Sequence, residues 1–98
     1  MIEHVVLFKV TPGATEEQQQ RVVEELKTLK GKIPGIIDLS VGRNFSSRSQ
    51  GFEIGLVVRF RDREALEAYL PHPAHRACVD TYINPIRADV IVVDYEIG

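Results

Sequence analysis

The sequence predicts an α+β fold in which one four-stranded antiparallel sheet carries its helices on a single face. Two observations support this class. Four segments are rich in β-branched and aromatic residues, and two segments with helical periodicity each lie between such strands. Strand residues alternate between two faces, whereas helical residues recur every three to four positions, so the two patterns can be told apart. The resulting order is β-α-β-β-α-β.

The first strand and helix are well marked. The segment IEHVVLFKV (2–10) ends at the turn signal TPG, which predicts a strand. Thr15 and Gln18 have the spacing of a capping box, which predicts a helix start, and Gly31 is the expected C-cap. The apolar positions that recur along this otherwise polar helix are Val22, Leu26 and Leu29.

The middle of the chain predicts a hairpin. The segments 34–44 and 52–60 are strands, and the polar loop 46–51 joins them. One face of the first of these strands is expected to carry Ile37, Leu39 and Val41. One face of the second is expected to carry Phe52, Ile54, Leu56, Val58 and Phe60.

The last third predicts two short helical segments and a strand. Asp62 is an N-cap for a helix that Pro71 ends. A second helical segment starts near Pro73, a favoured first-turn position, and runs towards Ile83. The segment RADVIVVDYEI (87–97) is the closing strand.

This order is that of the ferredoxin-like, split βαβ arrangement, in which the helices share one face of the sheet. Helix-facing positions of the first strand are then His4, Val6 and Phe8. The opposite face has no second helical layer, and its predicted apolar members are Val5, Leu7, Val57, Ile91 and Val93. Soluble proteins rarely expose so large an apolar patch, so we expect a homodimer whose sheets pack face to face into a closed barrel.

Composition excludes several classes. The 98 residues suit one domain spanning 1–98, and 44% hydrophobic with 27% charged residues is typical of globular chains. A net charge of −2 with dispersed Lys and Arg predicts no nucleic-acid surface. No run is long enough to span a membrane, and a single cysteine rules out an internal disulfide, so we expect a cytoplasmic protein.

The stretch AYLPHPAHRAC (68–78) holds most of the candidate chemistry. Histidine has an ordinary pKa near 6.5 and can remove a proton alpha to a carbonyl, while a tyrosine hydroxyl can stabilise the enolate oxygen that develops. His75 and Tyr69 are the candidates for these roles, from successive helical segments. The alternative is that Tyr69 is a core residue and His75 stabilises the turn.

His4 is expected to face the helices, and a buried histidine needs partners for its ring nitrogens. Asp94, on the last strand with the same expected orientation, is a candidate partner for either His4 or His75. Such a carboxylate would fix the tautomer and raise basicity, as in a catalytic dyad. A purely structural polar pair is the alternative.

A metal site at His72, His75 and Cys78 is disfavoured because Pro73 separates the two histidines and no second ligand cluster exists. No signal marks a haem or another cofactor. Cys78 has no basic neighbours that would favour a thiolate, which predicts a small buried apolar role.

The chain resembles the stress-responsive A/B barrel (Dabb) family of dimeric α+β barrels. The resemblance rests on IEHVVLFKV, GRNFS, GFEIGLVVRF, AYLPHPAH and VVDYE, of which the Y-x-x-HPAH element is the most specific. It implies a pocket between sheet and helices. A plant polyketide cyclase of this family works without a cofactor, through a Tyr and a His of the same element beside a strand-one His.

Carried onto this chain, the resemblance implies catalytic roles for Tyr69, His75 and His4. It also implies a substrate-binding lining that consists of Val6, Phe8, Ile54, Leu56 and Asp94. Ile54 stands where the cyclase has a further pocket histidine, so the shape that selects a long polyketide is not expected here. Two hypotheses stay open: a small enzyme or binder of carbonyl or phenolic compounds, and a non-catalytic stress-associated dimer.

Overall fold

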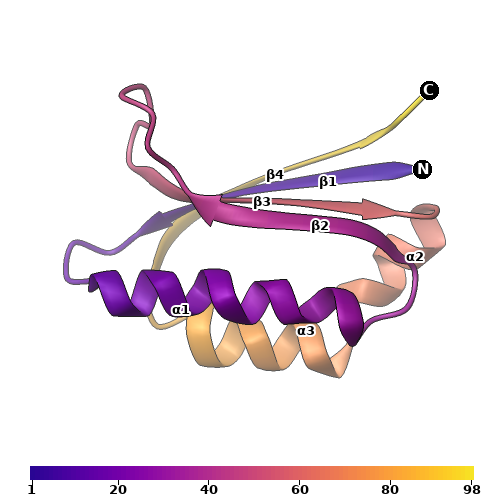
Figure 1. Ribbon diagram of the computed structural model, residues 1–98, viewed down its shortest axis with the longest axis horizontal. Helices are drawn as coiled ribbons and strands as arrows, with labels where there is room; N and C mark the ends of the chain where they lie inside the picture. Colours follow the sequence, from indigo (N-terminus) through magenta and orange to yellow (C-terminus); the bar gives the residue numbers. More distant parts are fainter.

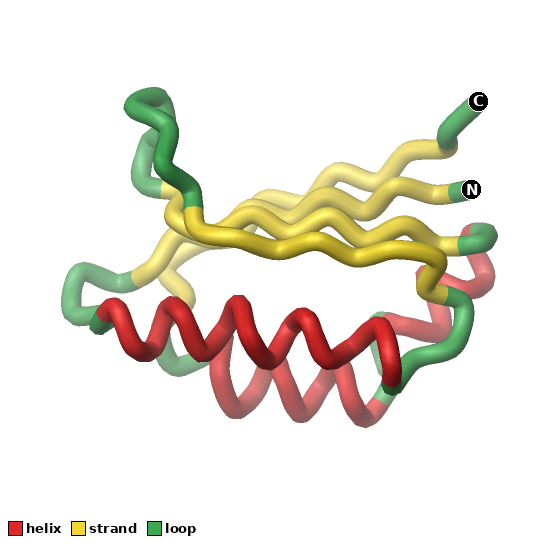
Figure 2. Tube along the Cα trace, in the orientation of Figure 1, coloured by secondary structure: helices red, strands yellow, loops and turns green.

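The computed structural model describes residues 1–98 and has the predicted element order. Its strands form one antiparallel sheet in the order β2-β3-β1-β4, and the helices lie on one face of it (Figures 1 and 2). The elements are β1 (Ile2–Val10), α1 (Glu16–Lys27), β2 (Ile36–Arg43), β3 (Phe52–Phe60), α2 (Arg63–Tyr69), α3 (Pro73–Cys78) and β4 (Arg87–Glu96). This topology confirms the ferredoxin-like α+β prediction.

The helix starts follow from local hydrogen bonding. Thr15 and Gln18 form the predicted capping box, in which each side chain accepts a hydrogen bond from the backbone N–H of the other residue. The Asp62 carboxylate accepts from the N–H of Ala65 at the start of α2. These contacts satisfy backbone donors that a helix start would otherwise leave unpaired.

The prediction that Gly31 caps the first helix is wrong. The chain tightens after Lys27 into a 3₁₀ turn, η1 (Thr28–Gly31), and the carbonyl of Leu29 accepts hydrogen bonds from the N–H groups of Lys32 and Ile33. Gly31 does not have a positive φ, whereas Gly35, just before β2, has φ of 92°. A Cβ at Gly35 would lie 2.7 Å from the Ala65 Cβ, so this glycine allows the chain to pass closely beside α2.

The predicted face of β2 is also partly wrong. The pairing with β3 shifts register between Ile36 and Asp38, so Ile36 packs with the core and Ile37 is exposed. Such an irregularity changes which side chain faces inward, because neighbouring strand residues point to opposite faces. Leu39 and Val41 keep the predicted orientation towards the core.

The core lies between the sheet and the helices. In β3 four of the five predicted residues are buried, but Phe52 is half-exposed and the Lys9 ammonium lies 5.0 Å from its ring centroid. Phe52 is the exception because the pairing of β3 with β1 shifts register between Phe8 and Lys9, so that Phe52 lies opposite Lys9. The buried hydrophobic residues of the sheet are Ile2, Val6, Phe8, Ile54, Leu56, Val58 and Phe60.

The other face of the sheet, called here the open face, has no helix over it (Figure 1). Register places Val5 opposite Val93 and Leu7 opposite Ile91, which confirms the predicted grouping. Val57 pairs with Val5 from the other side, and Tyr95 extends the apolar surface along β4. No helix of the structure has the length and apolar character needed to cross a bilayer.

Candidate functional site

The site is built around the break between α2 and α3. Pro71 follows the end of α2, and α3 begins at Pro73, where a missing N–H costs nothing. The Nδ1 atom of His72 accepts a hydrogen bond from the N–H of Ala74 and so caps α3. This turn brings the rings of Tyr69 and His75 together, with centroids 4.3 Å apart.

Tyr69 is completely buried. Its ring packs edge-on against Phe60, with 4.9 Å between centroids, and against His4 at 5.9 Å. Its hydroxyl has no hydrogen-bond partner. Burial raises the pKa of Tyr69 well above its ordinary value, so the phenol stays protonated at any physiological pH. The group is therefore an unused hydrogen-bond donor inside the packed interior.

His75 is half-buried, and its tautomer follows from its single hydrogen bond. The ring Nδ1 lies 2.9 Å from the carbonyl oxygen of Leu70, and because a carbonyl can only accept, Nδ1 carries the proton. In the neutral ring the Nε2 atom then has a free lone pair. Burial lowers the pKa of His75 below its ordinary value, which favours this neutral form near pH 7. His75 Nε2 is thus available as a base.

This shift gives the protein a pH-dependent stability. Because the pKa of His75 is below 6.5 in the folded chain, the unfolded chain binds the proton more readily between the two values. The free energy of unfolding therefore rises with pH through that window. The stability that depends on neutral His75 is fully present above pH 6.5 and is lost as the pH falls below the pKa of His75 in the folded chain. In urea unfolding from pH 8 to pH 5, wild type should lose more stability than His75→Asn. Parallel pH curves for the two proteins would contradict the assignment.

His4 and Asp94 form the other half of the site. They are directly opposite each other on β1 and β4, and the His4 Nδ1 contacts the Asp94 Oδ1. The sequence left open whether Asp94 pairs with His4 or with His75, and the structure shows the pair with His4. His4 is buried, whereas the Asp94 side chain is 40% exposed. The pair thus links the core around Tyr69 to the surface.

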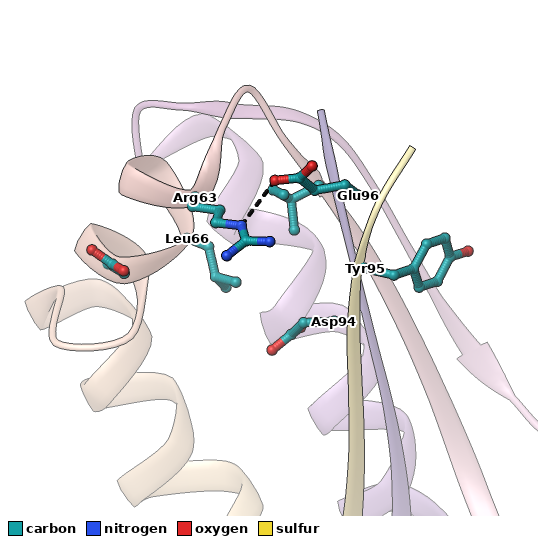
Figure 3. Close-up of a pocket in the computed structure, with 7 residues that line it drawn as sticks. Arg63, Leu66, Asp94, Tyr95 and Glu96 are labelled. Atoms are coloured by element: carbon teal, nitrogen blue, oxygen red, sulfur yellow. Dashed lines mark hydrogen bonds and ion pairs between the residues drawn. The ribbon is translucent and has the colours of Figure 1, made fainter. Parts of the chain in front are cut away.

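A cavity of about 270 Å³ lies where Asp94 reaches that surface, between α2 and the end of β4. Figure 3 shows the Asp94 carboxylate directed towards the helices, while Tyr95 points to the other side of the sheet. Arg63 and Glu96 close one side of the cavity with an ion pair of 2.9 Å. The remaining lining residues are Ile2, Leu66 and Glu67.

The residues of α2 in this cavity were not predicted as site residues, although a signal existed. Glu96 lies two residues beyond Asp94 and so shares its face of β4. Arg63 and Leu66 are three positions apart and so share one side of α2. What the pattern omits is that this side of the helix faces the end of β4 across the cavity.

The predicted binding residues Val6, Phe8, Ile54 and Leu56 are all buried in the core cluster. They do not line the cavity beside Asp94, and neither do Tyr69, His75 or His4. Tyr69 has no exposed surface in this structure, so a ligand could contact it only if the packing around it opened. The role of these residues in binding or catalysis remains a prediction.

The residues His72, His75 and Cys78 do not form a metal-binding cluster. His72 uses its Nδ1 as a helix cap, and Cys78 is buried as predicted, where burial raises the pKa of its thiol to about 11. The structure brings together no group of three His, Cys, Asp or Glu side chains suited to hold a metal ion.

Residues 2–97 match the family model described as the Stress responsive A/B Barrel Domain (Dabb). An uncharacterized protein of Streptomyces coelicolor is 32% identical over 98 residues, covering 98% of this chain and 99% of its own. Olivetolic acid cyclase of Cannabis sativa is 25% identical over 96 residues, covering 96% of this chain and 94% of the cyclase.

Among solved structures, a dimeric ferredoxin-like protein of unknown function from Thermobifida fusca superposes with a TM-score of 0.87. Its sequence is 26% identical, and the match covers 98% of this chain and 90% of that protein. The similarity thus extends over the strands, the helices and the open face.

Proposed function

The chain belongs to the stress-responsive A/B barrel family, and we propose that it is a homodimeric, cofactor-independent enzyme or binder of small carbonyl or phenolic compounds. We also propose that residues 1–98 form one domain and that the protein is cytoplasmic. The reduced state of Cys78, its single cysteine, agrees with that location. The observation that supports it most is the buried, unpartnered hydroxyl of Tyr69 beside the His75 ring.

An unpaired buried hydroxyl lowers stability, so a purely structural site would favour phenylalanine at this position. Tyrosine gains a purpose if the hydroxyl donates to a ligand. The neighbouring His75 Nε2 has the free lone pair that a proton abstraction requires. Together these groups form an acid–base pair in which both members are neutral at pH 7.

In the proposed reaction, His75 Nε2 takes a proton from the carbon alpha to a carbonyl. The electron pair of that C–H bond forms the C=C bond of the enolate, the π pair of the carbonyl moves to its oxygen, and the Tyr69 hydroxyl donates a hydrogen bond to that oxygen. The enolate carbon then attacks a second carbonyl, which closes a ring, and the new alkoxide oxygen takes the proton back from His75. Alternatively, His75 returns the proton to the opposite face or to another carbon of the enolate system, which gives an isomer. Neither route needs a cofactor.

His4 and Asp94 support this pair from β1 and β4. The carboxylate of Asp94 holds the His4 ring, which packs edge-on against Tyr69 and so helps to fix its orientation. The cavity beside Asp94 is the proposed entrance. Substrate reaches Tyr69 when the short helices α2 and α3 move apart at Pro71, and the predicted lining Val6, Phe8, Ile54 and Leu56 is then the apolar wall.

The homodimer is the second part of the proposal. The uncovered apolar residues of the open face need a partner, and a similar solved structure is described as dimeric. A two-fold axis would bring the same patch together from both copies and leave the helix side accessible.

A non-catalytic, stress-associated dimer is the second candidate. The observation that favours it is the closed packing of Tyr69, which has no exposed surface, together with the local bond from His75 to the Leu70 carbonyl. In that case these side chains only stabilise the break between α2 and α3.

The test is exchange of alpha protons of 4-phenyl-2-butanone in D₂O, followed by NMR. Wild type should accelerate exchange, and His75→Asn should lower the rate by about 100-fold because the base is lost. His72→Asn is the matched control, since asparagine also caps helices and should leave the rate unchanged. Equal rates in all three proteins, at the background level, would favour the structural alternative.

A further inference from the structure

The loop between β2 and β3, residues 44–51, rises from the sheet on the side away from the helices (Figures 1 and 2). Phe45 in this loop is 101% exposed, so its ring has no contact that shields it from water. The other large apolar residues on the surface are at most 55% exposed. Covering a ring that is exposed to this extent would remove a large apolar area from water and so favour association.

The loop is held in shape by its own hydrogen bonds. The Asn44 side chain donates to the carbonyl of Phe52 at 2.7 Å and accepts from the N–H of Ser46 at 2.8 Å, so it braces the chain on both sides of Phe45. Further along, the N–H of Arg48 bonds to the Ser46 hydroxyl. These hydrogen bonds fix the backbone on either side of Phe45, so the loop holds the ring in a defined position.

A hollow of about 550 Å³ lies at the base of the same loop, and its lining includes Leu7, Gly42, Gly55 and Val57. Gly42 and Gly55 face each other in register, and neither has a positive φ. A Cβ on Gly42 would meet nothing within 4 Å, and one on Gly55 only Leu7 at 3.9 Å. The fold itself therefore does not require glycine here. The two glycines leave space for a group from outside the chain.

We propose that Phe45 of each protomer inserts into the hollow at Gly42 and Gly55 of a second copy. This inference rests on the homodimer in the proposed function and identifies the contact that locks it. A projecting ring and a hollow on the same side of one chain match each other across a two-fold axis that passes between them. Each copy then supplies one ring and one hollow.

A second copy fits this surface better than an unrelated partner does. The hollow is continuous with the apolar open face, because Leu7 and Val57 belong to both. Its one charged lining residue, Arg43, already pairs its charge with Glu16 at 3.0 Å. Both halves of the contact are present in this one sequence.

The experiment measures the dimer dissociation constant by sedimentation velocity for wild type, Phe45→Ser, Gly42→Leu and the double variant. Phe45→Ser should raise the constant by about 100-fold, since two rings per dimer lose their burial. Gly42→Leu should also raise it, by filling the hollow. The double variant should be little weaker than either single one, because both changes break the same contact.

Leu70→Ser is the matched control, as Leu70 is 48% exposed and belongs to α2's end rather than to the open face. Its dissociation constant should equal that of wild type, and thermal melts should show that all variants fold. A wild-type dimer that is unchanged by Phe45→Ser and Gly42→Leu would overturn this contact while leaving the homodimer intact. If wild type stays monomeric at a protein concentration of about 100 μM, where even a weak dimer would form, both this contact and the homodimer would be overturned.

Discussion

Replacing Tyr69 with phenylalanine is expected to raise the free energy of unfolding by about 1 kcal/mol, while enolisation activity falls by about 100-fold. The hydroxyl has no partner in the folded chain, so its removal relieves a desolvation cost without removing a bond. The same hydroxyl is the proposed donor to the enolate, so its loss removes stabilisation of the transition state.

Alanine at the same position should behave differently. Tyr69 is among the largest fully buried side chains, and its truncation leaves a cavity beside Phe60 and His4. We expect Tyr69→Ala to lower the free energy of unfolding by about 3–5 kcal/mol. Chemical denaturation of the three proteins, together with ketone exchange, separates packing from chemistry. A phenylalanine variant that is less stable than wild type would show that the hydroxyl has a structural partner.

Aspartate in place of Val93 is expected to dissociate the homodimer, with a rise in the dissociation constant of at least about 1000-fold. Val93 lies opposite Val5 on the open face, so the dimer would bury two unpaired carboxylates near its centre. The isolated protomer should tolerate the change, because Val93 is 51% exposed there. Size measurement by light scattering across a dilution series reads the result.

The neighbouring residue offers a matched control. Val92 is 49% exposed, on the same strand, but alternation directs it to the helix side of the sheet. Val92→Asp should therefore leave the dimer intact. If both substitutions dissociate the dimer equally, or if neither does, the sheets do not pack through the open face.

Much of the fold could be predicted because its signals are local. The capping box at Thr15, the N-cap at Asp62 and the proline at the start of α3 each act within one helical turn. Alternation in β1 and β3 assigned His4 and Val5 to opposite faces correctly. The prediction failed at Gly31 and Ile37. A 3₁₀ turn replaced the expected helix end at Gly31, and a register shift between β2 and β3 turned Ile37 away from the core.

The candidate site divides in the same way. Local patterns were enough to predict that Tyr69 and His75 lie on either side of a proline break and that His4 and Asp94 face the helices. The pairing of Asp94 with His4, the unpartnered Tyr69 hydroxyl and the cavity that Arg63 and Glu96 enclose beside Asp94 emerge only from the folded chain. The physical reason is distance along the chain: 90 residues separate His4 from Asp94, and a contact of that range depends on how strands pair and helices pack, which no local pattern encodes.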